Sequence, residues 1–143
     1  EINEWFLAYG GTNLEEKKII VLDRIDCEKV NLLDVLGITE VELKNCIAQI
    51  RAEHSTSGTL LKKLGLEKDE IYQAINDQIT SGRVVLSKVI VSIWKKRGKK
   101  KITLIEYVGT AMLIWTMIKI RKEQGLLKKI SIPQNRGISY YIS

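Results

Sequence analysis

The chain has 143 residues, of which 45% are hydrophobic and 28% charged, and this composition excludes a disordered or fibrous protein. Its single proline and ten glycines also exclude a proline-rich linker. The formal net charge of +6 is unevenly spread: residues 1–70 hold 9 Lys and Arg against 14 Asp and Glu, whereas residues 71–143 hold 14 against 3. Such a distribution favours electrostatic attraction between two copies of the chain, or between the basic part and an anionic polymer.

The first segment of the chain contains the earliest helix signal. A capping box, in which a hydroxyl and a glutamate three residues later satisfy N–H groups at a helix start, is present at Thr12–Glu15. We therefore expect residues 1–41 to form an N-terminal helical extension. The acidic stretch "DRIDCE" at 23–28 is interpreted as a solvated face rather than a cation site.

Several helices are predicted in the middle of the chain. A second capping box at Thr39–Glu42 opens a segment with one apolar face, formed by Leu43, Cys46, Ile47 and Ile50. "SGTLLKKLG" predicts a short helix that ends at Gly65, and "EKDEIYQAINDQI" predicts a longer one. "RVVLSKVIVSIW" also fits the helical template, although its β-branched residues leave a strand as an alternative.

The basic block "KKRGKKK" at 95–101 separates two apolar runs. We expect it to be the turn between two helices, with Gly98 at positive φ and with cations that complement the dipole of the preceding helix. A third capping box at Thr103–Glu106 opens the next helix. The tail 125–143 is predicted to be extended, because Pro133 prevents a helix from continuing.

Chemistry-bearing motifs are missing from the sequence. Cys27, Cys46 and the single histidine, His54, show no metal-ligand spacing, and there is no Gly-rich phosphate loop, HExxH, CxxC or nucleophile elbow. We expect no catalytic residue, metal or cofactor, and hence not an enzyme. The N-terminus has no apolar run of a secretory signal, and two reduced thiols are typical of a cytoplasmic protein, which is the expected location.

Residues 42–124 resemble the death-domain family. The resemblance is carried by "LGLEKDEI" from Leu64, by a tryptophan late in a helix (Trp94), by the charged turn at 97–99, and by "TLIEYVGTAM". That family has six-helix antiparallel bundles that act as homotypic interaction adaptors, so the resemblance implies an all-α bundle. The implied or expected core anchors are Leu64, Leu66, Ile71, Ile90, Trp94, Ala111, Met112 and Trp115.

This resemblance implies a partner surface of each sign. The candidate basic surface consists of Arg83, Lys95, Lys96, Arg97, Lys99, Lys100 and Lys101. The candidate acidic surface consists of Glu40, Glu42, Glu67, Asp69 and Glu70. We expect the acidic surface of one molecule to meet the basic surface of a protein partner, above all of a second copy.

Two alternatives remain open from the sequence. In the first, "GTLLKKLGLEKDEIYQAINDQITSGRVV" is a helix-turn-helix, and "VVLSKVIVSIW" and "KKKITLIEYV" are strands of a winged-helix nucleic-acid-binding module. In the second, the apolar segment 102–120, flanked by cations, associates with a membrane.

Overall fold

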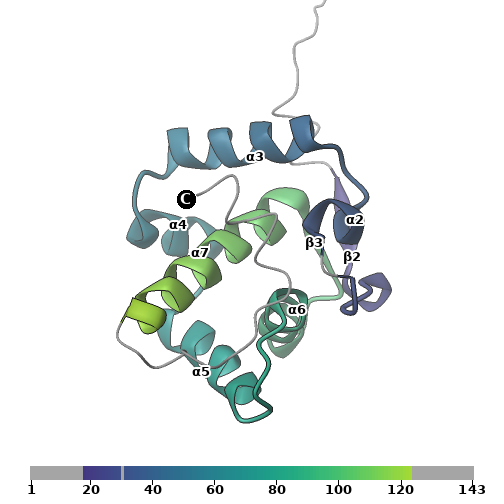
Figure 1. Cartoon of the computed structure of the whole chain (residues 1–143). Coiled ribbons are helices and arrows are strands. Elements are labelled where there is room, and N and C mark those ends of the chain that lie inside the picture. The colour runs from purple at the N-terminus through teal and green to yellow at the C-terminus, as the bar shows by residue number, and fades with distance from the viewer. Residues whose placement is uncertain (1–17, 30, 124–143) are drawn as a thin grey trace, which may run out of the picture.

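The computed structural model describes residues 18–29 and 31–123 (Figure 1). In chain order the elements are strand β2 (Ile19–Val21), the short 3-10 helix η1 (Leu22–Arg24), helices α2 (Leu32–Leu36), α3 (Glu40–Glu53), α4 (Ser57–Leu64), α5 (Lys68–Ile79) and α6 (Leu86–Lys96), strand β3 (Lys101–Thr103) and helix α7 (Leu104–Glu123). The described part is therefore mostly helical, with six α-helices, as the sequence predicted. The predicted capping box at 12–15 and the extended tail 125–143 lie outside it.

Local signals placed the helices correctly. The Thr39 hydroxyl accepts from Glu42 N at 3.1 Å, and the Glu42 carboxylate accepts from Thr39 N at 2.9 Å, so the predicted capping box opens α3. The same reciprocal pair joins Thr103 and Glu106 at the start of α7. Gly65 ends α4 with φ of 70°, which is the left-handed conformation that glycine adopts without strain.

Strand β2 corrects the expected helical character of residues 1–41. It pairs antiparallel with β3, Ile20 opposite Ile102, and both of these side chains are buried. No local pattern predicts this pairing, because each strand has three residues and its partner lies about eighty residues away. Ile20, together with Leu32 and Leu36 of α2, belongs to the same core as the later helices.

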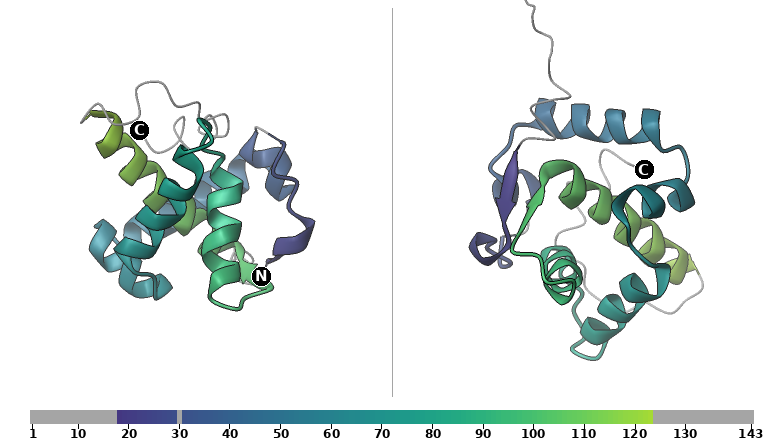
Figure 2. Two further views of the ribbon diagram at one scale, coloured as in Figure 1. Left: turned by 90° about the horizontal axis from the view of Figure 1, so that it is seen from below. Right: turned by 180° about the vertical axis from the view of Figure 1, so that it is seen from behind.

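Helix α7 runs through the centre of the molecule (Figures 1 and 2). Figure 1 shows α3 on one side of it and α5 on the opposite side, and α4, α6, β2 and β3 also contact it. Most of its residues from 104 to 118 are buried. The apolar run at 102–120 is thus explained by burial from all sides, the situation of a helix inside a core. No helix in the described part of the chain has the length and apolarity needed to cross a membrane.

The interface between α6 and α7 contains polar groups that pair with each other. The hydroxyls of Ser87 and Tyr107 are 2.8 Å apart, and Trp94 Nε1 donates to Thr110 Oγ1 at 3.0 Å. Thr110 in turn donates to the carbonyl of Glu106 at 2.6 Å. Burial raises the pKa of Tyr107 far above its ordinary value, so the phenol is neutral at physiological pH.

The expected core anchors are nearly all buried. This holds for Leu64, Leu66, Ile71, Ile90, Trp94, Ala111 and Met112, whereas Trp115 is partly buried against the core.

The β-hairpin of the winged-helix alternative is wrong. Residues 86–96 form helix α6, and β3 pairs with β2 instead of with the segment before it. The β-branched residues of α6 line its buried face, among them Val89, Ile90 and Ile93, so tertiary burial outweighs their strand propensity.

Candidate interaction surface

The predicted basic block lies at the end of α6 and in the turn that leads to β3. Gly98 has φ of 80°, its N–H donates to the carbonyl of Lys95 at 2.9 Å, and Lys99 N donates to the carbonyl of Trp94 at 3.0 Å. This hydrogen-bond pattern ends a helix and reverses the chain. The block is therefore the turn that the sequence predicted, although it connects a helix to a strand.

Three of its cations are paired within the chain. Lys95 Nζ lies 2.5 Å from Asp23 Oδ1, Lys96 Nζ lies 3.5 Å from Asp77 Oδ2, and the Arg97 guanidinium holds both carboxylate oxygens of Glu70. Glu70 and Arg97, which the sequence assigned to opposite partner surfaces, thus contact each other. The Arg97 guanidinium lowers the pKa of the Glu70 carboxyl, and Lys95 lowers that of Asp23.

Two carboxylates of the acidic stretch 23–28 pair with lysines of helix α6. Lys88 and Lys95 are seven residues apart and therefore lie on one face of the helix. Asp23 pairs with Lys95, and Glu28 lies 3.9 Å from Lys88. The seven-residue spacing of the two lysines, about two helical turns, was the sequence signal for this arrangement. The acidic stretch itself contains no pattern that indicates its distant partner. Across the described residues, no group of three side chains could hold a metal ion.

The members of the predicted acidic surface have different interactions within the molecule. Glu42 and Glu70 cap helices α3 and α5, since each accepts a backbone N–H at the helix start, at 2.9 and 2.6 Å. Glu40 pairs with Lys44 one turn later, at 3.2 Å. Two members remain, Glu67 and Asp69 at the start of α5, which are exposed and form no ion pair with the described part of the chain.

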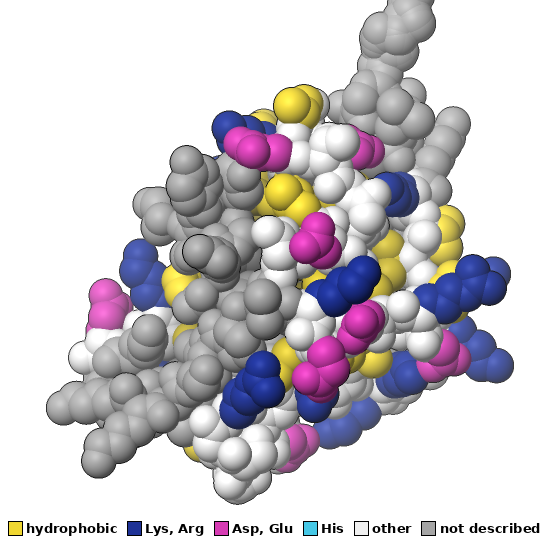
Figure 3. All heavy atoms as spheres, turned by 45° about the vertical axis from the view of Figure 1, so that its right-hand side comes forward, with side chains coloured by type: hydrophobic (Ala, Val, Ile, Leu, Met, Phe, Trp, Pro, Cys, Tyr) yellow, Lys and Arg dark blue, Asp and Glu magenta, His cyan; other side chains and the backbone are white. Residues whose placement is uncertain are grey.

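Three consecutive lysines remain from the basic surface. We call Lys99, Lys100 and Lys101 the lysine turn; all three are exposed, and no carboxylate within 18–29 or 31–123 forms a salt bridge with them. Arg83, also exposed, lies before α6 and is separated from the lysine turn by the length of that helix, about 16 Å. Figure 3 shows acidic and basic side chains interleaved on one face of the molecule, as the ion pairs above lead one to expect.

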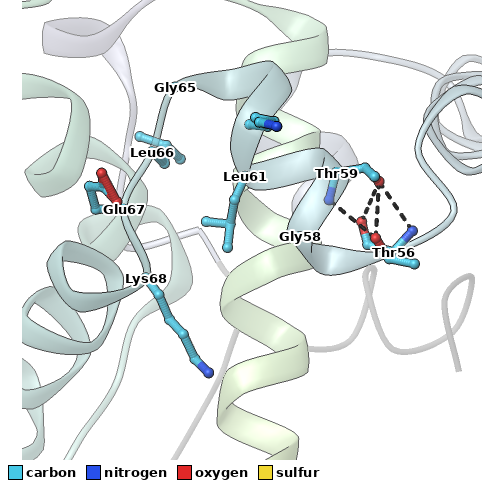
Figure 4. Close-up of a pocket in the computed structure, with 9 residues that line it drawn as sticks. Thr56, Gly58, Thr59, Leu61, Gly65, Leu66, Glu67 and Lys68 are labelled. Atoms are coloured by element: carbon cyan, nitrogen blue, oxygen red, sulfur yellow. Dashed lines mark hydrogen bonds between the residues drawn. The ribbon is translucent and has the colours of Figure 1, made fainter.

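Two hollows lie on the described part of the surface. A shallow groove of about 620 Å³ lies between α4 and the start of α5 (Figure 4), where the hydroxyls of Thr56 and Thr59 bond to each other at 3.2 Å. A smaller cavity of about 170 Å³ includes His54, whose Nε2 lies 3.9 Å from a Glu53 oxygen. Burial raises the pKa of the Cys27 thiol, which is the opposite of what an activated nucleophile needs.

The ion pair between Arg97 and Glu70 predicts a loss of stability in acid. The folded state lowers the pKa of Glu70, so the pair contributes fully above the ordinary glutamic acid pKa of about 4.3 and is lost as the pH falls through the lower folded value. Between about pH 5 and pH 3 the urea unfolding midpoint should fall less for Glu70→Gln than for the unchanged chain. The variant has no carboxylate to protonate, while its glutamine still caps α5. Asp69→Asn, an exposed position one residue before Glu70, is the control and should follow the unchanged chain; equal slopes for all three would contradict the prediction.

Comparison with protein-family models, with curated proteins and with solved structures found no match.

Proposed function

We propose that this chain is a non-enzymatic protein–protein interaction domain, and that the lysine turn receives the carboxylates of its partner. The observation that carries the proposal is the difference between the two parts of the basic block. Lys95, Lys96 and Arg97 are each neutralised by a carboxylate of the same molecule, whereas the lysine turn is exposed and without such a pair in the described residues. The resemblance to death domains and the six α-helices support the same class of function.

The expected affinity is low and sensitive to salt. An exposed ion pair contributes about 0–1 kcal/mol, so three lysines supply at most a few kcal/mol. Salt at 1 M shortens the screening length to about 3 Å and removes most of that attraction. Charges of this kind determine orientation and the rate of encounter more than strength of binding.

A second copy of the chain is the first partner to test, because it offers Glu67 and Asp69. Two geometries are compatible with contact between the lysine turn of one molecule and the start of α5 in another: a head-to-tail contact, which builds rings or filaments, and a two-fold pair in which the contact is made twice. This is the homotypic association that the death-domain resemblance implies.

Light scattering at low and high salt tests the proposal. We expect the mass to exceed that of a monomer at low salt, either for the chain alone or with poly-L-glutamate added, and to return to the monomer value at high salt. Lys99→Glu combined with Lys101→Glu should abolish the increase. Lys62→Glu combined with Lys63→Glu, an equal charge change on the exposed side of α4, is the matched control and should keep it.

A charge swap separates self-association from a folding defect. If two copies meet as proposed, Glu67→Lys with Asp69→Lys should also give a monomer, and the chain that carries all four reversals should associate again. A mass that rises with a DNA duplex of equal charge, but with neither poly-L-glutamate nor the chain itself, would overturn the proposal in favour of the nucleic-acid alternative.

A further inference from the structure

The outer face of the β2–β3 sheet lies directly beside the lysine turn. Because side chains alternate along a strand, Ile20 and Ile102 point into the core while Ile19, Val21, Lys101 and Thr103 share the opposite face. Ile19 is 53% exposed, and it is one of three large apolar side chains that are exposed in the described part of the chain. The face thus combines an apolar side chain with a cation.

Two carboxylates lie near this face, and both already have partners within the chain. Asp23, at the end of β2, is held by Lys95, and the carboxylate of Glu106 is held by the backbone N–H of Thr103. Lys101 is directly opposite Val21 in the ladder, and Lys99 and Lys100 precede it. The complementary ligand therefore carries carboxylates next to an apolar side chain.

A second copy of the chain does not offer this combination at its unpaired carboxylates. Leu66 precedes Glu67 and Ile71 lies two residues after Asp69; these side chains are 5% and 0% exposed and so unable to reach another molecule. The self-association tested above would use the lysine turn without the sheet face.

We propose that the outer face of β2–β3 and the lysine turn together dock an acidic amphipathic helix of another protein. This inference rests on the proposed function and names the class of partner. Ile19 and Lys101 are two positions apart along the ladder, about 7 Å. One turn of a helix advances by about 5.4 Å, so an apolar residue and a glutamate four positions later match this spacing. An apolar side chain of the helix packs on Ile19, and its carboxylates face Lys99 and Lys101.

Two synthetic peptides of eighteen residues test the inference with the full chain. Both are helical sequences with the same number of glutamates. One has a leucine at every fourth position, next to the glutamates, and the other has an alanine at each leucine position. Binding is followed by NMR chemical shifts of the chain at low salt and at high salt. We expect the leucine peptide to bind several-fold more tightly, to keep part of its affinity at high salt, and to shift the resonances of Ile19 and Lys101.

Variants separate the apolar contact from the charges. Ile19→Thr retains a β-branched residue in the strand, and it should lower the affinity for the leucine peptide by roughly three- to fivefold while leaving the alanine peptide unchanged. Val41→Thr is the matched control, since Val41 is 64% exposed at the start of α3 and should not affect either peptide.

The failures of the two proposals are distinguishable. Lys99→Glu combined with Lys101→Glu should lower the affinity of the chain for both peptides. If that reversal weakens binding but the leucine peptide binds no better than the alanine peptide, or Ile19→Thr changes nothing, the sheet face is not part of the docking surface and the proposed function stands. If neither peptide binds at low salt, the acidic-helix partner is wrong, and the light-scattering mass of the chain alone then decides whether the lysine turn docks a second copy.

Discussion

Trp94→Ala is expected to lower the free energy of unfolding by about 3–5 kcal/mol, a large part of the 5–15 kcal/mol that holds a typical domain together. Trp94 is 2% exposed and is among the largest fully buried side chains. Its removal leaves a cavity between α6 and α7, and it also breaks the hydrogen bond to Thr110. Urea denaturation followed by circular dichroism measures the effect.

Two further variants divide this loss into its causes. Trp94→Phe retains an apolar ring but loses the Nε1 donor; Thr110 keeps its bond to the Glu106 carbonyl, so a smaller loss is expected, about 1–2 kcal/mol. Trp115→Ala should also cost less than Trp94→Ala, because Trp115 is only partly buried. If Trp115→Ala proved the more costly of the two, the extent of burial would not determine the cost of removing a tryptophan from this core.

Gly109→Val is the second substitution with a large expected effect. A Cβ at Gly109 would lie 3.1 Å from Leu64 Cδ1 and 3.4 Å from Leu60 Cδ1, so α4 packs closely on α7 here and even a methyl group would require Leu64 to shift. Valine adds three carbons there, and overpacking of this kind costs about 1–3 kcal/mol, occasionally more. The same urea titration reports the change.

Gly58→Val is its matched control. Gly58 also lies in a helix, but the nearest atom to a Cβ there is Thr56 Oγ1 at 3.8 Å, so valine gains its helical propensity over glycine without a clash. We expect Gly58→Val to be neutral or slightly stabilising. Leu64→Ala combined with Gly109→Val should recover part of the loss, because it removes the atom at 3.1 Å. Equal effects of valine at 58 and at 109 would show that close packing does not determine the cost.

The features predicted correctly from sequence are those decided within a few residues. The capping boxes at Thr39 and Thr103, the end of α4 at Gly65 and the turn at Gly98 each depend on local hydrogen bonds or backbone angles. The periodicity of apolar residues likewise predicted the core face of α3, formed by Leu43, Cys46, Ile47 and Ile50.

The features missed are those that join distant segments. The pairing of β2 with β3 and the contact between Glu70 and Arg97 link residues that are far apart in the chain, and neither leaves a local pattern. Helix α7 was expected to begin at Thr103–Glu106, but its place at the centre follows from the helices that surround it. The sequence also did not indicate that three of the seven cations of the candidate basic surface pair with carboxylates of the same molecule.

The central position of α7 has a consequence for the order in which the molecule folds during translation. Helices α3 to α6 all contact α7, which is synthesised after them. Their apolar faces therefore leave the ribosome without their common partner, and the core closes after residues 104–118 have emerged. A nascent chain halted before that point would expose these faces to chaperones and to other chains, so the interval before α7 emerges is the vulnerable one for these helices.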